Sequence, residues 1–270
     1  MATHLIVYGH GAGDPGAVGN GTNERDFNRK ILHPYLKKWA DKSKDSFVFF
    51  DITGSRDMFQ ETANGWGMYS INSNQYASVT ELHEDAASAS ATGGHVIISS
   101  SFNPDKEDLN LAQTIKRIVG WWGGVSATRG ISFRNNLLNL NVAAQRGITY
   151  RLMELGFITS KRDMDIIKNT LDGYAQGIIE EITGEKLGGN NVTKPIIYQD
   201  KQGWYEALRD DTFYCEKELK RKSRWNIKKG NVIYVDRIEK IGKYTRAKID
   251  NGPHTRYCTL RDDFWKYLGK

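Results

Sequence analysis

A glycine-rich segment near the start of the chain carries side chains of the kinds that bind metal ions. Within residues 8–24, His10 follows a short apolar run, and Glu24 begins a segment with helical periodicity. Two further candidates, His83 and Glu154, each close an apolar run of the kind that forms strands. Because ligand sites of α/β proteins lie at the carboxyl ends of strands, we expect these four side chains to meet at one metal site.

The types of these residues indicate zinc chemistry. A catalytic zinc ion commonly has three protein ligands and keeps a fourth position for water, and His10, Glu24 and His83 supply such a set. Zinc lowers the pKa of its water towards ~7, and a nearby carboxylate can take the proton and pass it to a leaving amine. We assign this second role to Glu154. The glycines permit the sharp turns and close backbone approach that such a site needs. No spacing rule fixes four residues this far apart, so the set is a hypothesis.

The elements that would position these residues alternate between strands and helices. This order predicts an α/β fold with a twisted, mostly parallel sheet flanked by helices. We expect strands at 4–8, 46–51, 77–83, 95–99 and 148–154, and helices at 24–41, 106–120 and about 164–183, the last ending at Gly184.

Charge divides the chain of 270 residues into two parts. Residues 1–191 have 19 Lys and Arg against 21 Asp and Glu, whereas residues 192–270 have 19 against 11. The net charge of +6 therefore belongs to the second part, which carries +8 against −2 for the first. A basic part beside a nearly neutral one favours a polyanionic partner, although a solvated basic face is an equal alternative.

The pattern of apolar and turn-forming residues changes at the same place. Residues 185–194 are rich in glycine and asparagine and lack apolar periodicity, which predicts a linker between a domain at 1–184 and a domain at 195–270. Short alternating runs separated by turn signals predict that the second domain is a small all-β module. It holds both cysteines, Cys215 and Cys258, for which two thiols are favoured over a single bridge.

Three motifs resemble those of a known family. Gly-His-Gly-Ala-Gly-Asp-Pro-Gly-Ala with Gly-Thr-Asn-Glu at 9–24, Glu-Leu-His-Glu-Asp-Ala at 81–86 and Glu-Leu-Gly-Phe-Ile-Thr-Ser-Lys-Arg-Asp at 154–163 resemble, in order, motifs of zinc-dependent N-acetylmuramoyl-L-alanine amidases of the amidase-3 type. These enzymes occur in phage endolysins and bacterial autolysins. The resemblance covers roughly residues 3–183.

The resemblance implies a role for each candidate residue. It places the metal ligands at His10, Glu24 and His83 and the catalytic carboxylate at Glu154, with bacterial peptidoglycan as substrate and Zn²⁺ as cofactor. The implied reaction cleaves the amide between N-acetylmuramic acid and the L-alanine of the stem peptide. Asp85 departs from the asparagine usual in the family, and a carboxylate only accepts hydrogen bonds where an amide also donates them.

The part of the second domain from about 226 to 267 resembles bacterial SH3-like cell-wall-binding domains of endolysins. Its tryptophans and tyrosines either stack on sugar rings or fill the core of a small barrel, and the core is favoured for most of them. Its lysines suit an anionic wall polymer such as teichoic acid, and no nucleic acid partner is expected.

Other readings are less favoured. The run from Gly11 to Gly16 matches G-x-G-x-x-G, but Asp51 lies 35 residues after Gly16, where about 20 are expected of a dinucleotide site. Position 87 is alanine, so H-E-x-x-H is absent. A noncatalytic cell-wall or polyanion-binding protein is the alternative function. With neither a signal peptide nor an apolar membrane span in the sequence, we expect synthesis in the cytoplasm and action on the cell wall.

Overall fold

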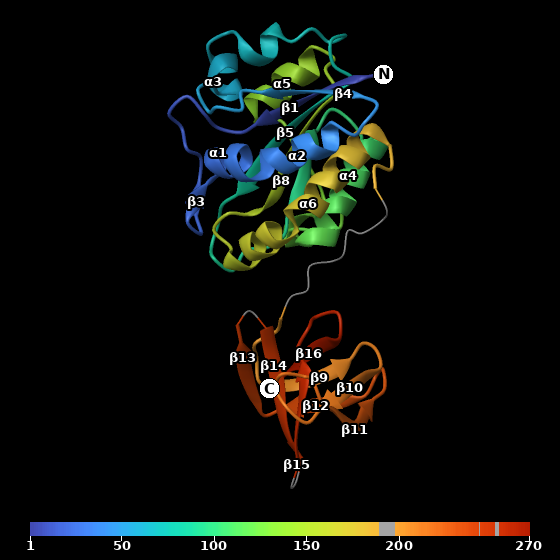
Figure 1. Ribbon diagram of the computed structural model, residues 1–270. Helices are drawn as coiled ribbons and strands as arrows, with labels where there is room; N and C mark the ends of the chain where they lie inside the picture. Colours follow the sequence, from blue (N-terminus) through green and yellow to red (C-terminus); the bar gives the residue numbers. More distant parts are fainter. Residues whose placement is uncertain (189–197, 243, 252–253) are drawn as a thin grey trace. The chain divides into compact units, whose positions relative to one another are not determined.

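The computed structural model describes residues 1–188, 198–242, 244–251 and 254–270. The chain forms two compact units, Met1–Pro195 and Ile196–Lys270, which are described separately (Figure 1). From residue 189 onward, the linker expected at 185–194 lies outside the described residues. Before that point, Glu185 accepts hydrogen bonds from the backbone of Lys44 at 3.1 and 3.2 Å.

A six-stranded sheet forms the centre of the first unit, in the order β4-β1-β5-β8-β6-β7. Four of its neighbouring pairs are parallel, and only β6 and β8 run antiparallel. The sheet is therefore mixed and mostly parallel, as expected. Its strands are β1 (Thr3–Tyr8), β4 (Ser46–Phe50), β5 (Ser78–Asp85), β6 (His95–Ser99), β7 (Ile131–Arg134) and β8 (Tyr150–Phe157).

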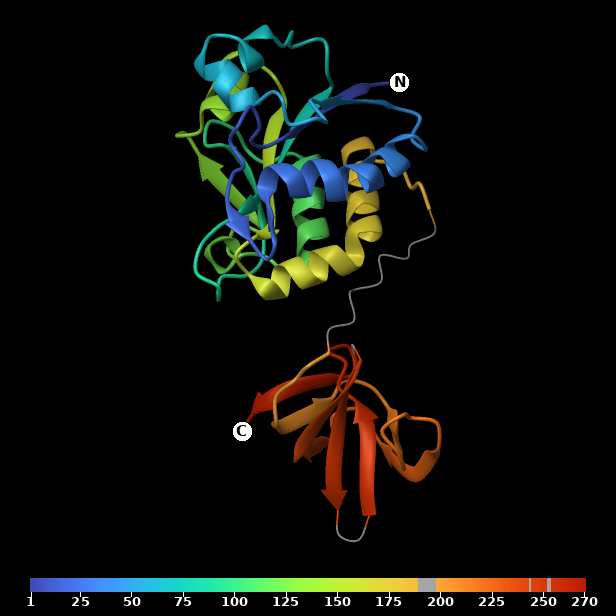
Figure 2. The ribbon, with the colours of Figure 1, turned by 60° about the vertical axis from the view of Figure 1, so that its left-hand side comes forward.

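Helices cover both faces of this sheet (Figures 1 and 2). On one face lie α1 (Glu24–Asp26), α2 (His33–Ala40), α4 (Lys106–Ile118) and α6 (Lys161–Thr183). On the other lie α3 (Met58–Ala63) and α5 (Leu138–Gln145), with a 3-10 turn at Gly67–Ser70. A second 3-10 turn spans Gly123–Val125.

Local sequence explains where the main elements begin and end. Strand β1 is buried from its second residue onward, in agreement with its central place in the sheet. Helix α4 begins with a capping box between Asp105 and Asp108, and α6 ends at Gly184, whose φ of 70° suits glycine. The helix expected at 24–41 forms as α1 and α2 joined by a π-helical segment, Phe27–Leu32.

Several short elements were not expected from the sequence. They are β7, α3, α5 and the hairpin of β2 (Val18–Gly19) and β3 (Thr22–Asn23). Each is short and is interrupted by polar residues, so it lacks the continuous apolar run that marks β1 and β6. The hairpin occupies the segment after Gly16, where a dinucleotide-binding fold would begin its helix, so that alternative fails on structure as well.

The second unit is all-β in its described residues, as expected. A five-stranded sheet has the order β11-β10-β15-β14-β13, and a three-stranded sheet has the order β12-β9-β16. The strands are β9 (Gly203–Ala207), β10 (Asp211–Tyr214), β11 (Lys222–Ile227), β12 (Val232–Val235), β13 (Arg237–Ile241), β14 (Tyr244–Asn251), β15 (His254–Thr259) and β16 (Trp265–Gly269).

The core of this unit contains part of its aromatic residues. Tyr205 and Trp265 are fully buried, whereas Trp204, Trp225 and Tyr234 stay at least 39% exposed. Both cysteines are free thiols, as favoured from the sequence, although Cys215 is only partly buried. Among the described residues of the whole chain, no helix is both long and apolar enough to cross a membrane.

Candidate metal centre

Three of the predicted residues meet at the carboxyl ends of the parallel strands. His10 follows β1, Glu24 opens α1, and His83 lies near the end of β5. Their ligating atoms all lie within 4.8 Å of one another. Residues separated by up to 73 positions in the chain are thus brought to one place by the order of strands in the sheet.

The carboxylate of Glu24 lies between the two imidazoles. Its Oε1 is 3.2 Å from Nε2 of His10, and its Oε2 is 3.2 Å from Nδ1 of His83. The backbone N–H groups of Ala17 and Glu84 also donate to it, at 2.8 and 3.2 Å. Burial alone would raise the pKa of Glu24, but the hydrogen bonds from both histidines hold that pKa well below its usual range. The carboxylate is therefore ionised and available as a ligand.

Each histidine is oriented by a second carboxylate. Nδ1 of His10 is 2.8 Å from Oδ2 of Asp14, and Nε2 of His83 is 3.0 Å from Oε1 of Glu81. These contacts leave Nε2 of His10 and Nδ1 of His83 facing Glu24. A carboxylate on the far nitrogen of a metal-binding imidazole fixes the tautomer and the ring orientation.

Glu81 itself is held by two donors. Asn139 Nδ2 donates to its Oε2 at 2.9 Å, and the Tyr150 hydroxyl donates to the same oxygen at 2.6 Å. No role was predicted for Glu81 from the sequence. The signal was present, because residues 81 and 83 of one strand share a face of the sheet.

The glycines allow the backbone to approach these rings. A β-carbon on Gly9 would lie 2.1 Å from Cε1 of His83, and one on Gly16 would lie 2.5 Å from Cδ2 of His10. The buried Arg29 holds the loop in place by donating to the backbone carbonyls of Tyr8, Gly9 and His10 at 2.6 to 3.1 Å. Side chains larger than hydrogen at Gly9 and Gly16 would displace the histidines.

Glu154 lies beside this group, in strand β8. It is directly opposite His83 on β5 and His95 on β6. Its carboxyl is partly buried, and its Oε2 has no hydrogen-bond partner. Burial raises the pKa of Glu154 to about 8, and the nearby charges of Asp85 and Glu24 act in the same direction. β8 continues to Phe157, so Glu154 lies inside the strand and not at its end as expected.

Two further side chains lie near Glu154. His95 is buried and shares a 2.8 Å hydrogen bond with Ser132. Burial lowers the pKa of His95 to about 4, so its ring is neutral at pH 7. Oδ2 of Asp85 lies 3.9 Å from Nε2 of His95, too far for a hydrogen bond.

The donor set fits zinc. Two imidazole nitrogens and one carboxylate oxygen leave one tetrahedral position open, and an unpartnered carboxyl oxygen lies beside them. The class of protein that these observations define is an α/β protein with a candidate mononuclear metal centre at the carboxyl ends of its parallel strands. The chain belongs to the Amidase_3 family, described as N-acetylmuramoyl-L-alanine amidase, whose model matches residues 5–184.

Individual relatives agree with this assignment. The chain is 46% identical over 194 residues to the protein named Probable autolysin PH from Staphylococcus aureus (strain NCTC 8325 / PS 47). The match covers 68% of this chain but only 39% of that protein.

Solved structures share the fold at low sequence identity. The catalytic domain of the CD27L endolysin targeting Clostridia Difficile has a TM-score of 0.55 at 19% identity, and the match covers 70% of this chain and all of that one. An N-acetylmuramoyl-L-alanine amidase from Clostridium difficile 630 has a TM-score of 0.53 at 21% identity, covering 68% and 95%.

Proposed function

We propose that the first unit is a zinc-dependent peptidoglycan amidase that cleaves the amide between N-acetylmuramic acid and the L-alanine of the stem peptide. Family membership supports the amidase activity and the wall substrate. The observation that carries the zinc dependence is the meeting of His10, Glu24 and His83, with the unpartnered oxygen of Glu154 beside them.

The chemistry divides between the ion and the chain. A zinc ion held by His10, Glu24 and His83 would polarise the scissile carbonyl and make water a better nucleophile at neutral pH. Glu154 takes a proton from the attacking water while the water oxygen forms a bond to the carbonyl carbon. Glu154 then donates that proton to the alanine nitrogen as the C–N bond breaks. Glu81 and Asp14 hold the two imidazoles in the orientation that ligation requires.

The environment of Glu154 suits a group that both takes and gives a proton. With a pKa raised to about 8, this carboxyl is a stronger base than an exposed glutamate. A positive ion at the neighbouring ligands would draw its pKa back towards neutrality, where a group can act first as base and then as acid.

We propose that the second unit is an SH3-like targeting domain for the cell wall. Its sequence carries the excess positive charge of the chain, which suits an anionic wall polymer such as teichoic acid. A cavity of about 600 Å³ is lined in part by Trp204, Trp225 and Tyr234, whose exposed rings can stack on wall sugars. The resemblance of the second domain to the wall-binding domains of endolysins favours a phage or prophage enzyme that lyses bacteria from within.

Digestion of purified Gram-positive cell walls tests this function. We expect release of L-alanine amino termini without new reducing sugar ends, and loss of that release with a chelator or in His10→Ala. His33→Gln is the matched control, since His33 is also partly buried but bonds to Tyr8 away from the centre. Release that persists in chelator would overturn the zinc dependence. Wall binding without any release would favour the noncatalytic binding protein.

A further inference from the structure

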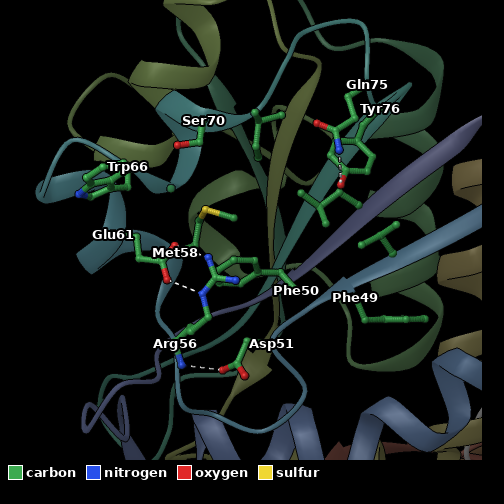
Figure 3. Close-up of a pocket in the computed structure, with 14 residues that line it drawn as sticks. Phe49, Phe50, Asp51, Arg56, Met58, Glu61, Trp66, Ser70, Gln75 and Tyr76 are labelled. Atoms are coloured by element: carbon green, nitrogen blue, oxygen red, sulfur yellow. Dashed lines mark hydrogen bonds and ion pairs between the residues drawn. The ribbon is translucent and has the colours of Figure 1, made fainter.

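A second cavity of the first unit lies outside the metal centre. It has a volume of about 680 Å³, within the range of roughly 300–1,000 Å³ found for small-molecule sites. Figure 3 shows Trp66 on one side of it, Gln75 and Tyr76 on the other, and Glu61 with Arg56 lower in the view. Its apolar lining comes from β1 and β4, from α3 and from the end of the 3-10 turn, and includes Leu5, Val48, Phe50, Met58 and Ile71.

This cavity shares a wall with the metal-binding loop. The segment between β4 and α3 packs against that loop, because Ala12 N–H donates to Gly54 at 3.0 Å. A β-carbon on Gly11 would lie 2.0 Å from the carbonyl oxygen of Arg56. The carboxylate of Asp57, at the start of α3, lies within 4.8 Å of ligand atoms of His10 and Asp14. The cavity and the metal centre are thus separated by one loop.

The charges that line the cavity are already compensated. The guanidinium of Arg56 donates twice to Glu61, at 2.6 and 2.7 Å, and lies 4.6 Å from the centre of the Phe50 ring. The carboxylate of Asp51 accepts from the backbone of Arg56 and from Thr53. The guanidinium of Arg56 is therefore engaged along one edge by Glu61 and on one face by Phe50, and the cavity suits a neutral ligand better than an anionic one.

Ring faces and fixed polar groups remain available to such a ligand. Trp66 is 67% exposed, and Tyr76 is partly exposed with its hydroxyl 3.0 Å from the Gln75 amide. Sugars bind by laying their apolar ring face on an aromatic side chain while their hydroxyl and acetamido groups meet carboxylates, guanidinium and amides. A neutral N-acetylated sugar meets each of these requirements.

We infer that this cavity binds N-acetylated sugar residues of the glycan strand while the amide lies at the metal centre. The inference rests on the proposed function, since the scissile amide is attached to a sugar and the glycan must continue past the metal. An extended peptide added to the free edge of β4 is the competing occupant, and the test separates the two.

The test is a titration of the full chain, in chelator, with N,N′-diacetylchitobiose, a neutral glycan that carries no peptide. Binding is followed by NMR of the tryptophan indole N–H groups, with the Trp66 signal identified by its absence in Trp66→Phe. We expect the Trp66 signal to shift and Trp66→Ala to weaken binding roughly fivefold or more. Phe59→Ala is the matched control, because Phe59 of α3 is a 54% exposed aromatic seven residues before Trp66 and does not line the cavity.

The second unit has exposed tryptophans of its own, so Trp225→Ala tests whether the sugar binds there. Binding that is lost in Trp225→Ala and kept in Trp66→Ala would overturn the inference. So would a Trp66 signal that shifts only with free stem peptide. Because the titration is done in chelator, it measures sugar binding separately from the metal-dependent cleavage. A chain that binds the sugar at Trp66 but releases no alanine would overturn the proposed function alone, whereas cleavage without this binding would overturn only the sugar site.

Discussion

His83 and Glu81, two residues apart on β5, form a pair in which Nε2 of the partly buried ring lies 3.0 Å from the buried carboxylate. The pair fixes which nitrogen of His83 faces the other proposed ligands. Burial would lower the pKa of His83, but its hydrogen bonds to Glu24 and Glu81 raise it well above the usual value. Without an ion, this ring therefore stays protonated between two carboxylates, and metal binding must release a proton.

Glu81→Gln tests the orienting role of this carboxylate. An amide oxygen can still accept from His83, but it lacks the charge that makes the ring a strong ligand. We expect zinc affinity to fall roughly 10- to 100-fold, measured by competition with a chromophoric chelator. Asp45→Asn is the control, since Asp45 faces His4 at 3.5 Å outside the centre. Equal affinities for Glu81→Gln and the parent would show that Glu81 has only a structural role.

Gly9→Ala tests the close approach of backbone and ring. The added methyl group would lie 2.1 Å from Cε1 of His83, so the ring must move from its place facing Glu24. We expect zinc affinity to fall more than tenfold and the unit to lose about 1–3 kcal/mol of unfolding free energy. Gly123→Ala should change neither quantity, because no atom lies within 4 Å of its added β-carbon. A Gly9→Ala variant with full affinity would contradict the steric argument.

The sequence predicted the elements whose apolar pattern is unambiguous. Strand β1 has an uninterrupted apolar run, and helix α6 repeats its apolar positions over 23 residues, so both form as expected. The orienting contact of Glu81 depends on Asn139 and Tyr150, more than 50 residues away, and only the order of strands brings them together. Likewise, nothing local to His95 indicates that it lies opposite Glu154. Tertiary contacts of this kind carry no signal in a single sequence.

Glu154→Gln tests the proposed proton transfer. The amide keeps the size of the side chain but cannot take a proton, so the rate of wall digestion should fall about 10²- to 10⁴-fold. Metal content, measured by atomic absorption, should be unchanged because Glu154 is not a proposed ligand. Asp85→Asn is the matched control, since it makes the same change of group beside the centre and introduces the family's usual residue. An active Glu154→Gln variant would require another base.

We expect the stability of the first unit to depend on pH because of a charged cluster at the end of the sheet opposite the candidate metal centre. The buried guanidinium of Arg151 contacts three carboxylates, those of Asp105, Glu107 and Asp108. One positive charge does not balance three negative ones, and burial is the main cause that raises the pKa of Glu107 to about 7. The folded state therefore binds this proton more tightly than the unfolded state, in which the pKa is near 4.5.

The sign of the effect follows from that difference. The contribution of Glu107 is fully present below pH 4.5 and is lost as the pH rises through 7. Glu107→Gln mimics the protonated form at every pH. Relative to the parent, we expect this variant to have a similar unfolding free energy at pH 5 and one larger by on the order of 2 kcal/mol at pH 8.

Unfolding in guanidinium chloride measures this difference when it is followed by the circular dichroism signal of α-helices, because all described helices belong to the first unit. Chelator is included so that metal binding adds no pH dependence of its own. Glu180→Gln is the control with the opposite sign. Burial alone would raise the pKa of Glu180, but its hydrogen bonds from Gln176 and Leu187 lower it. Glu180→Gln should therefore be less stable than the parent by nearly the same amount at pH 5 and at pH 8, because Glu180 titrates below this pH range. If Glu107→Gln gave the same difference from the parent at both pH values, Glu107 would be ionised throughout and paired with Arg151.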